Sequence, residues 1–124
     1  MKRVVALGLG LLALAAAHAV AQNKPAAVYY VAEFEMTDPV GYRKFGESIE
    51  PIIKSYGGKF VARRGKIVPW VGEAPKGITI IMFENLEKGQ SWIQSPEAKA
   101  LFALRDESSK GRRGYFVEAG NAPP

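Results

Sequence analysis

Glu33 and Arg63 are the two residues of this chain best suited to chemistry on a bound molecule. Glu33 alternates with apolar residues in a segment typical of a β-strand, and a carboxylate buried among apolar neighbours becomes a stronger base. Such a group could remove a proton from an acidic C–H bond or a phenol, and the Arg63 guanidinium could stabilise the resulting anion. The alternative is that Glu33 and Arg63 form a cross-strand or inter-subunit ion pair with a structural role.

The register of the second predicted strand decides which arginine can meet Glu33. A shift of one residue would turn Arg63 outward and Arg64 inward, because side chains alternate between the two faces of a sheet. Arg105, beside apolar residues of a predicted helix, is a further cationic candidate. It could anchor an anionic group of a ligand, or it could pair with a carboxylate such as Glu47 or Glu97.

Three more residues are expected to bind a ligand. Tyr29 and Trp70 could form the walls of a site for a flat organic molecule, with Met82 in its apolar interior. Trp70 follows Pro69 near a turn, so a lid or a subunit contact is equally compatible with its position. Aromatic residues at strand and helix spacing also form cores and interfaces, and this alternative stays open.

The composition excludes most metal, thiol and histidine chemistry. The chain contains no cysteine and one histidine, His18, which lies in a segment typical of a cleaved leader. Zinc, copper and haem sites usually draw on His or Cys, as do Ser-His-Asp triads and cysteine nucleophiles. No calcium-binding loop of the D-x-D-x-D-G type is present either. We therefore expect no metal and no cofactor in the mature protein.

The first 21 residues have the order of a secretory signal. Lys2 and Arg3 precede the apolar run 4–17, and small residues follow, with cleavage expected after Ala21 or, as a second choice, after Ala19. The apolar run is shorter than the roughly 20 residues of a membrane-spanning helix, so no span is expected after cleavage. These features predict a periplasmic or secreted protein, with an uncleaved N-terminal anchor as the alternative.

The rest of the chain has the size and charge of one small domain. Removal of 21 of the 124 residues leaves 103, with a flexible lead-in over 22–27, a domain over 28–119 and a tail over 120–124. The leader contains two of the 17 basic residues and none of the 12 acidic ones, so the net charge falls from +5 to +3. A nucleic-acid-binding surface needs a larger one-sided excess. Without disulfides, stability depends on the core or on association of subunits.

The hydrophobic pattern alternates between strand and helix periods. Residues 28–36 have the period of two that is typical of a strand, and Thr37-Asp38-Pro39 is a helix start. An amphipathic helix is predicted over 39–56, with a kink at Pro51 and an end at Gly57-Gly58. The remaining predicted elements are a strand over 59–64 with an optional extension over 66–71, a strand over 78–84, helices over 86–94 and 96–110, and a strand over 115–119.

This β-α-β-β-α-β order predicts an α+β, ferredoxin-like fold, in which a four-stranded antiparallel sheet has its helices on one face. The other face would carry apolar side chains, and leaving each of them in water forgoes about 1.5–3 kcal/mol. A second copy of the chain is the economical cover, so we expect a homodimer with a small cavity between two sheets. The residues expected to face this space are Phe60, Val61, Ile78, Ile80 and Met82.

Several short motifs over residues 28–119 resemble the domain of unknown function 1330 (DUF1330) family. They are Val28-Tyr29-Tyr30-Val31, Thr37-Asp38-Pro39, Tyr42, Tyr56-Gly57-Gly58-Lys59-Phe60, Arg63, Phe83, Trp92, Ser95-Pro96-Glu97 and Leu104-Arg105. The resemblance implies the dimeric α/β-barrel form of the ferredoxin-like fold, without a securely assigned activity. The chain departs from the family pattern at Ala98-Lys99, where an aromatic–polar pair is frequent, and at Met82, where a charged residue is frequent. Both departures imply a more apolar interior.

Two functions from different classes are compatible with these residues. The first is an exported dimeric protein that binds a small apolar or aromatic molecule, with a cofactor-free enzyme as its catalytic variant. The second is a non-catalytic dimeric module with a structural or partner-binding role. A well-formed cavity would favour the first function, and a fully packed space would favour the second.

Overall fold

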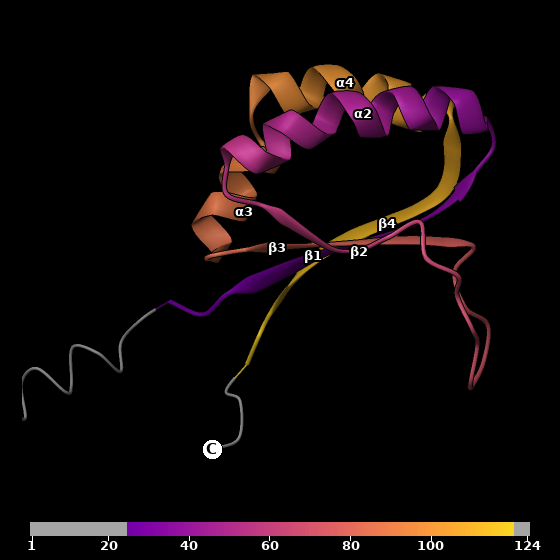
Figure 1. Cartoon of the computed structure of the whole chain (residues 1–124), viewed down its shortest axis with the longest axis horizontal. Helices are drawn as coiled ribbons and strands as arrows, with labels where there is room; N and C mark the ends of the chain where they lie inside the picture. Colours follow the sequence, from indigo (N-terminus) through magenta and orange to yellow (C-terminus); the bar gives the residue numbers. More distant parts are fainter. Residues whose placement is uncertain (1–24, 121–124) are drawn as a thin grey trace, which may run out of the picture.

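The computed structural model describes residues 25–120, in which a four-stranded sheet lies against three helices (Figure 1). All strand pairs are antiparallel, and the order across the sheet is β2-β3-β1-β4. The α+β, ferredoxin-like fold is confirmed, with the second helical segment divided into α3 and α4. The elements are β1 (Val28–Met36), α2 (Pro39–Ser55), β2 (Lys59–Arg63), β3 (Gly77–Phe83), α3 (Leu86–Ile93), α4 (Pro96–Glu107) and β4 (Ser109–Glu118).

The predicted leader over 1–21 lies outside the described residues, as do residues 22–24 of the lead-in and 121–124 of the tail. Within residues 25–120, none of the helices is both long enough and apolar enough to cross a membrane.

Helix α2 begins at the predicted cap. The Asp38 carboxylate accepts a hydrogen bond from the backbone N–H of Val40 at 3.1 Å, and Pro39 occupies the first turn, where its missing N–H costs nothing. The helix includes Pro51 and continues to Ser55. Gly57 then adopts a φ of +79°, which favours glycine, and the chain turns into β2.

The last strand is longer than predicted. β4 begins at Ser109, whereas the sequence pattern placed its start at Tyr115 and extended the preceding helix over 96–110. The helix ends at Glu107, and the hydroxyls of Ser108 and Ser109 donate to carbonyls of its last turn, both at 2.6 Å. These bonds satisfy the helix end and leave the following residues free to pair with β1 along most of its length.

The packed core lies between the sheet and the helices, at the end of the molecule that contains α3. Val28 and Phe83 are fully buried, and Ile53 of α2 is 1% exposed. The Phe83 ring stacks on the Trp92 ring of α3, with centroids 5.5 Å apart. Helix α3 therefore closes this end of the space between sheet and helices.

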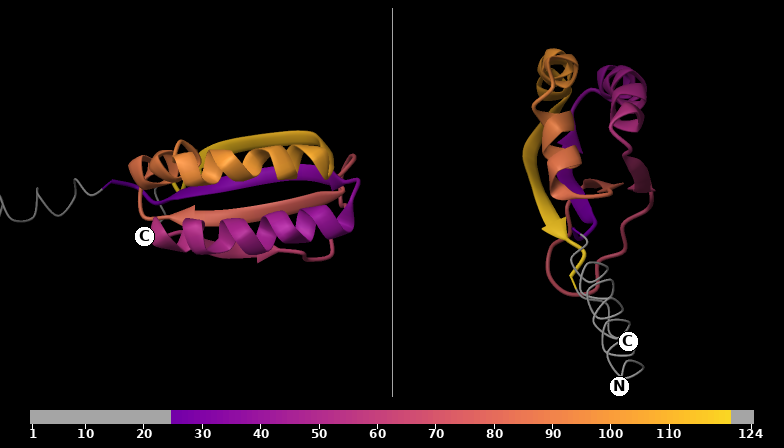
Figure 2. Two further views of the ribbon diagram at one scale, coloured as in Figure 1. Left: turned by 90° about the horizontal axis from the view of Figure 1, so that it is seen from above. Right: turned by 90° about the vertical axis from the view of Figure 1, so that its left-hand side faces the viewer.

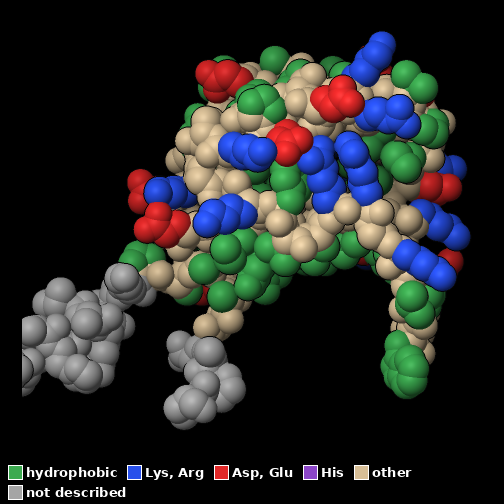
Figure 3. Space-filling model, viewed as in Figure 1, with side chains coloured by type: hydrophobic (Ala, Val, Ile, Leu, Met, Phe, Trp, Pro, Cys, Tyr) green, Lys and Arg blue, Asp and Glu red, His purple; other side chains and the backbone are tan. Residues whose placement is uncertain are grey.

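The opposite face of the sheet, which we call the open face, is not covered by any helix of the described residues (Figure 1). The register pairs Tyr29 with Met82 and Val31 with Ile80 on this face. In the space-filling view, hydrophobic side chains gather along the underside of the sheet (Figure 3). The apolar residues of the open face are Tyr29, Val31, Ile78, Ile80, Met82, Tyr115 and Val117.

One residue expected on the open face lies elsewhere. Phe60 pairs with Ile81 and packs against the core on the helix side, whereas the following Val61 is 57% exposed. The reason is an irregularity in the β2–β3 register between Phe60 and Ala62. It shifts the alternation, so that Arg63 faces the helices as Phe60 does.

Residues 64–76 form an arm between β2 and β3. The chain leaves the sheet at Arg64, which adopts a φ of +58°, and the predicted strand extension over 66–71 is wrong. The arm projects past the sheet on the side away from the helices (Figure 1). Near its tip, Val68, Trp70 and Val71 are 73%, 93% and 88% exposed.

Candidate functional site

A cavity of about 730 Å³ lies between the sheet and the helices α2 and α4. Seen from above, these two helices run side by side over the sheet, with the central strands visible between them (Figure 2). Strands β1 and β3 provide the floor, and α2 and α4 provide the roof. The predicted cavity between two sheets of a dimer is therefore not the cavity seen here, which belongs to one subunit and lies on the other face of the sheet.

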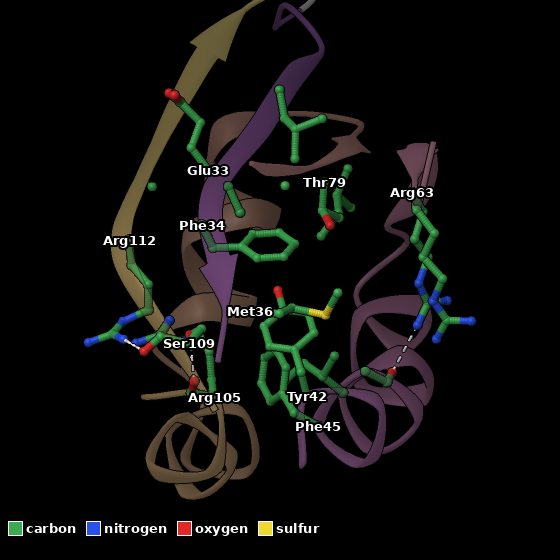
Figure 4. Close-up of a pocket in the computed structure, with 18 of the residues that line it drawn as sticks. Glu33, Phe34, Met36, Tyr42, Phe45, Arg63, Thr79, Arg105, Ser109 and Arg112 are labelled. Atoms are coloured by element: carbon green, nitrogen blue, oxygen red, sulfur yellow. Dashed lines mark hydrogen bonds between the residues drawn. The ribbon is translucent and has the colours of Figure 1, made fainter. Parts of the chain in front are cut away.

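Aromatic rings fill the centre of this cavity wall (Figure 4). Phe34 of β1 stacks on Tyr42 of α2, with centroids 4.6 Å apart, and Tyr42 contacts Phe45 at 5.6 Å. Gly77 makes room for this stack, because a Cβ at that position would lie 2.6 Å from the Phe34 ring. The arrangement offers flat apolar surfaces to a ligand.

The deeper end of the cavity is formed by Tyr30 and Trp92. Their rings meet edge to face, with centroids 5.3 Å apart. The Trp92 Nε1–H is buried and has no hydrogen-bond acceptor among the described residues. Gly114 lies against the Tyr30 hydroxyl, since a Cβ at Gly114 would be 2.3 Å from that oxygen. This end therefore holds polar hydrogens within apolar walls.

The two tyrosines are held in their neutral form. Burial raises the pKa of Tyr42 to about 12, against a smaller opposing effect of the nearby Arg105 charge. Burial also raises the pKa of Tyr30, and Arg105 again opposes it. At neutral pH both hydroxyls are therefore protonated and can donate hydrogen bonds.

Arg63 borders the cavity but does not pair with Glu33. Its guanidinium donates to the Glu50 carboxylate at 3.0 Å and to the Gly46 carbonyl at 3.1 Å, both on α2. It also lies over the Phe60 ring at 4.2 Å. The hydrogen bond from Arg63, followed by that from Lys54, lowers the pKa of Glu50.

Glu33 is part of the cavity lining, but its carboxylate points toward β4 and the open face. Its carboxylate accepts hydrogen bonds from Arg113 at 2.9 Å and from the Tyr115 hydroxyl at 2.8 Å. The bond to Glu33 raises the pKa of Tyr115. Figure 4 shows Glu33 turned away from the aromatic centre of the cavity.

The expected pair of Glu33 and Arg63 is therefore wrong within one subunit. The register irregularity after Phe60 turns Arg63 toward the helices, whereas the register with β4 places Glu33 opposite Arg113. A catalytic role of either residue stays a hypothesis.

The other predicted site residues are divided between the two faces. Arg105 borders the cavity, where it lies over the Phe102 ring at 4.2 Å and bonds to Asp106 at 2.8 Å. Its predicted pairing with Glu47 or Glu97 is wrong, because the adjacent Asp106 is its partner.

Tyr29 and Met82 pair with each other on the open face, and Trp70 lies on the arm. None of these three residues borders the cavity. Their role as walls of a space between two sheets stays a prediction.

Phe34 and Tyr42 were not among the predicted site residues, although the predicted strand over 28–36 and the predicted amphipathic helix over 39–56 contain them. The signal that could have singled them out is Gly77, a glycine beginning a strand where a side chain would normally fill the space. Among residues 25–120, no three acidic side chains gather in a way that could hold a metal ion.

Fold and pocket together define a ferredoxin-like α+β domain with an aromatic pocket between its sheet and its helices. The family model of the domain of unknown function DUF1330 matches residues 27–119. The chain belongs to this family, as its motifs indicated. No curated protein sequence matches the chain.

Solved structures share this fold at low sequence identity. The RPA0582 protein of unknown function from Rhodopseudomonas palustris is 15% identical, with a TM-score of 0.65 over 85% of this chain and 94% of its own. SnoaB, a cofactor-independent oxygenase from Streptomyces nogalater, is 12% identical, with a TM-score of 0.58 over 80% and 98%. A dimeric ferredoxin-like protein of unknown function from Bacteroides fragilis is 19% identical, with a TM-score of 0.53 over 77% and 98%. At these identities the similarity establishes the fold alone.

Proposed function

We propose that this protein is an exported homodimer that binds a small, flat, largely apolar or aromatic molecule in the pocket between its sheet and its helices. The observation that carries the proposal is the cavity of about 730 Å³. Pockets for small molecules commonly measure about 300–1,000 Å³ and combine apolar walls with a few polar groups. A fully packed space between the sheet and the helices would have favoured a structural module instead.

The lining favours an aromatic ligand over a flexible aliphatic one. Phe34 and Tyr42 already lie parallel within 23°, so they offer a stacking surface that needs no rearrangement. The Arg63 guanidinium borders the cavity as a hydrogen-bond donor, and the neutral hydroxyls of Tyr30 and Tyr42 are further donors within its lining. A flat ring system with polar atoms at its edge would match this distribution.

The lining of the cavity favours binding of a ligand over a cofactor-free reaction of that ligand. The only carboxylate that borders the cavity within residues 25–120 is Glu33, and both of its oxygens already accept hydrogen bonds. A general base at this position would have to give up Arg113 or Tyr115 first. The fold shared with SnoaB does not transfer that protein's reaction to this chain.

The homodimer is proposed from the open face of the sheet. Tyr115 and Val117 are 44% and 45% exposed there, beside the half-buried Val31, Ile80 and Met82. Complete burial of a fully exposed apolar side chain is worth about 1.5–3 kcal/mol, and each of these partly buried side chains would contribute a fraction of that amount. The dimeric protein from Bacteroides fragilis, which shares the fold, is in line with this proposal.

Export is proposed from the order of residues in the leader over 1–21. Its removal would leave a protein without His or Cys in the periplasm or outside the cell. Mass spectrometry of the protein recovered after expression with the leader intact tests this part. A mature N-terminus at Gln22 or at Val20 supports it, and a full-length chain in the cytoplasm contradicts it.

The test of binding compares two adjacent residues of β3 that face opposite sides. Thr79→Phe would place a ring in the cavity, whereas Ile80→Phe would place the same ring on the open face. The melting temperature of each variant and of the unmodified protein is measured with a panel of aromatic acids, phenols and quinones. We expect ligands to raise the melting temperature of the unmodified protein and of Ile80→Phe, and not that of Thr79→Phe.

Far-ultraviolet circular dichroism verifies that both variants are folded. Binding that survives in folded Thr79→Phe would place the ligand outside the cavity, and the absence of any shift across the panel would remove the proposed function.

A further inference from the structure

We propose that the natural ligand of the cavity is an aromatic carboxylate, whose acid group is held where Arg63 and Arg64 meet α2. The proposal rests on the proposed function, namely that the cavity binds a small aromatic molecule, and it names the chemical class of that molecule.

The charges around the cavity are strongly unequal. Seven Lys and Arg side chains border it, against one carboxylate, Glu33. The ion pairs of these cations involve three carboxylates, which are Glu33, Glu50 and Asp106. Asp106 is shared between Arg105 and Arg112. Cations therefore remain in excess around an apolar space, which raises the local concentration of anions.

Two guanidinium groups converge at one edge of the cavity. A Cβ at Gly46 of α2 would lie 3.1 Å from Nη2 of Arg63 and 3.7 Å from Nη2 of Arg64. Arg63 is engaged by Glu50. Arg64 has no hydrogen bond or ion pair with any described residue. The two positively charged guanidinium groups therefore lie near each other and repel. An anion bound between them would remove this repulsion.

The backbone at Arg64 supports the same location. Its φ of +58° is unusual for a residue other than glycine and costs roughly 1 kcal/mol or more. The next residue, Gly65, has open space around its Cα and could adopt such a conformation freely. The chain instead turns at an arginine on the rim of the pocket, and residues in strained conformations are found preferentially at functional sites.

A carboxylate fits this edge better than other small anions of the same charge. The planar guanidinium fork of arginine matches the two oxygens of a carboxylate in a bidentate geometry. The stack of Phe34 and Tyr42 on the cavity wall would receive the ring system of the same molecule. One ligand with a ring and an acid group therefore uses both features.

The experiment uses matched pairs of ligands and matched variants. Isothermal titration compares benzoate, 2-naphthoate and anthracene-2-carboxylate with their uncharged primary amides. The proteins are the unmodified chain, Arg64→Gln, Arg64→Lys and the control Lys99→Gln, which removes a charge from an exposed position of α4 outside the cavity lining. We expect at least one acid to bind about 10-fold more tightly than its amide, as is typical when a charge-assisted hydrogen bond is added.

Arg64→Gln should remove most of this preference, Arg64→Lys should keep part of it, and Lys99→Gln should leave it unchanged. Equal affinity for acids and amides in the unmodified protein would overturn the carboxylate inference, while the proposed binding function would stand. A preference that persists in Arg64→Gln would overturn the assigned location. Absence of binding for every acid and amide would remove both proposals together.

Discussion

The two faces of this sheet carry similar apolar residues in different surroundings. On β3, Ile81 faces the helices and is 3% exposed, whereas its neighbour Ile80 faces away and is only partly buried in the single chain. The hydrophobic pattern is thus comparable on both sides, and only the placement of the helices distinguishes them. An apolar sheet face can serve as core, pocket floor or subunit contact, and composition alone does not separate these roles.

The helix face itself is divided in the same way. At the end with α3, large side chains meet in a packed core around Phe83. Toward the arm and the start of β4, Gly77 and Gly114 occupy floor positions whose Cβ atoms would collide with aromatic rings. The absence of side chains at these two positions lets the Phe34 and Tyr30 rings lie directly on the floor of the cavity.

The largest expected effect concerns the open face. Ile80→Lys would place an unpaired charge in the centre of the proposed subunit interface, at a cost of several kcal/mol. We expect a dimer for the unmodified chain and a folded monomer for the variant in sedimentation experiments at micromolar concentration. Val40→Lys, at an exposed position near the start of α2 in the helix layer, is the control and should remain dimeric. A stable monomer of the unmodified chain would contradict the proposed contact.

Adjacent isoleucines allow a comparison of the two faces within one strand. Ile81→Ala should lower the free energy of unfolding by about 2–5 kcal/mol, because it empties a packed core position. Ile80→Ala should cost less, and its cost should depend on protein concentration because the lost contact belongs to an association. Urea unfolding at two protein concentrations measures both. Equal and concentration-independent costs would mean that the two faces are not distinguished in this way.

A glycine substitution tests how closely the residues on the cavity side of the sheet are packed. Gly114→Ala would place a Cβ 2.3 Å from the hydroxyl of the buried Tyr30, and such overpacking costs about 1–3 kcal/mol. Gly65→Ala is the matched control, since its Cβ would meet no atom within 4 Å. Thermal unfolding should show a lower melting temperature for the first variant only. If both variants melt alike, the floor is not as closely packed as the structure indicates.

The smallest expected effect concerns the pKa values of Tyr42 and Tyr115, which are raised by different causes. Burial holds the pKa of Tyr42 at about 12, against 10.0 for an ordinary tyrosine, whereas the Glu33 carboxylate raises the pKa of Tyr115. Because the folded pKa of Tyr42 is the higher one, its contribution to stability is complete below pH 10.0 and is lost as pH rises toward about 12. Tyr42→Phe should therefore weaken the decline of stability in this range.

Glu33→Gln provides the contrasting change on the open face. It should lower the pKa of Tyr115 toward its ordinary value and leave the pKa of Tyr42 unchanged. A spectrophotometric titration of the phenolates, with Tyr115→Phe as the reference, measures this difference. A shift of Tyr42 in Glu33→Gln would show that the two faces are electrostatically coupled.

The sequence predicted the fold because local signals and topology agree. The alternation from Val28 to Met36 and the helix start at Thr37-Asp38-Pro39 each involve a few neighbouring residues, and the structure has them where the pattern indicated. The order of elements then leaves few arrangements for a four-stranded sheet.

The site depended on features that no local signal contains. The irregularity after Phe60 reverses the side on which Arg63 lies, and the early end of α4 brings Arg112 and Arg113 into β4. Both features depend on pairing between distant strands. The residues of the expected site were consequently divided between two faces, although its members Arg63 and Arg105 do border the cavity.

The chain has two tryptophans, and the fold assigns them to opposite environments. Trp92 is 3% exposed beside the cavity, whereas Trp70 is 93% exposed on the arm. Their fluorescence should therefore consist of a blue-shifted component that quenchers cannot reach and a red-shifted component that they can. Occupation of the cavity would alter the first component and an event at the arm the second, so the unlabelled protein carries separate optical reporters for its two sides.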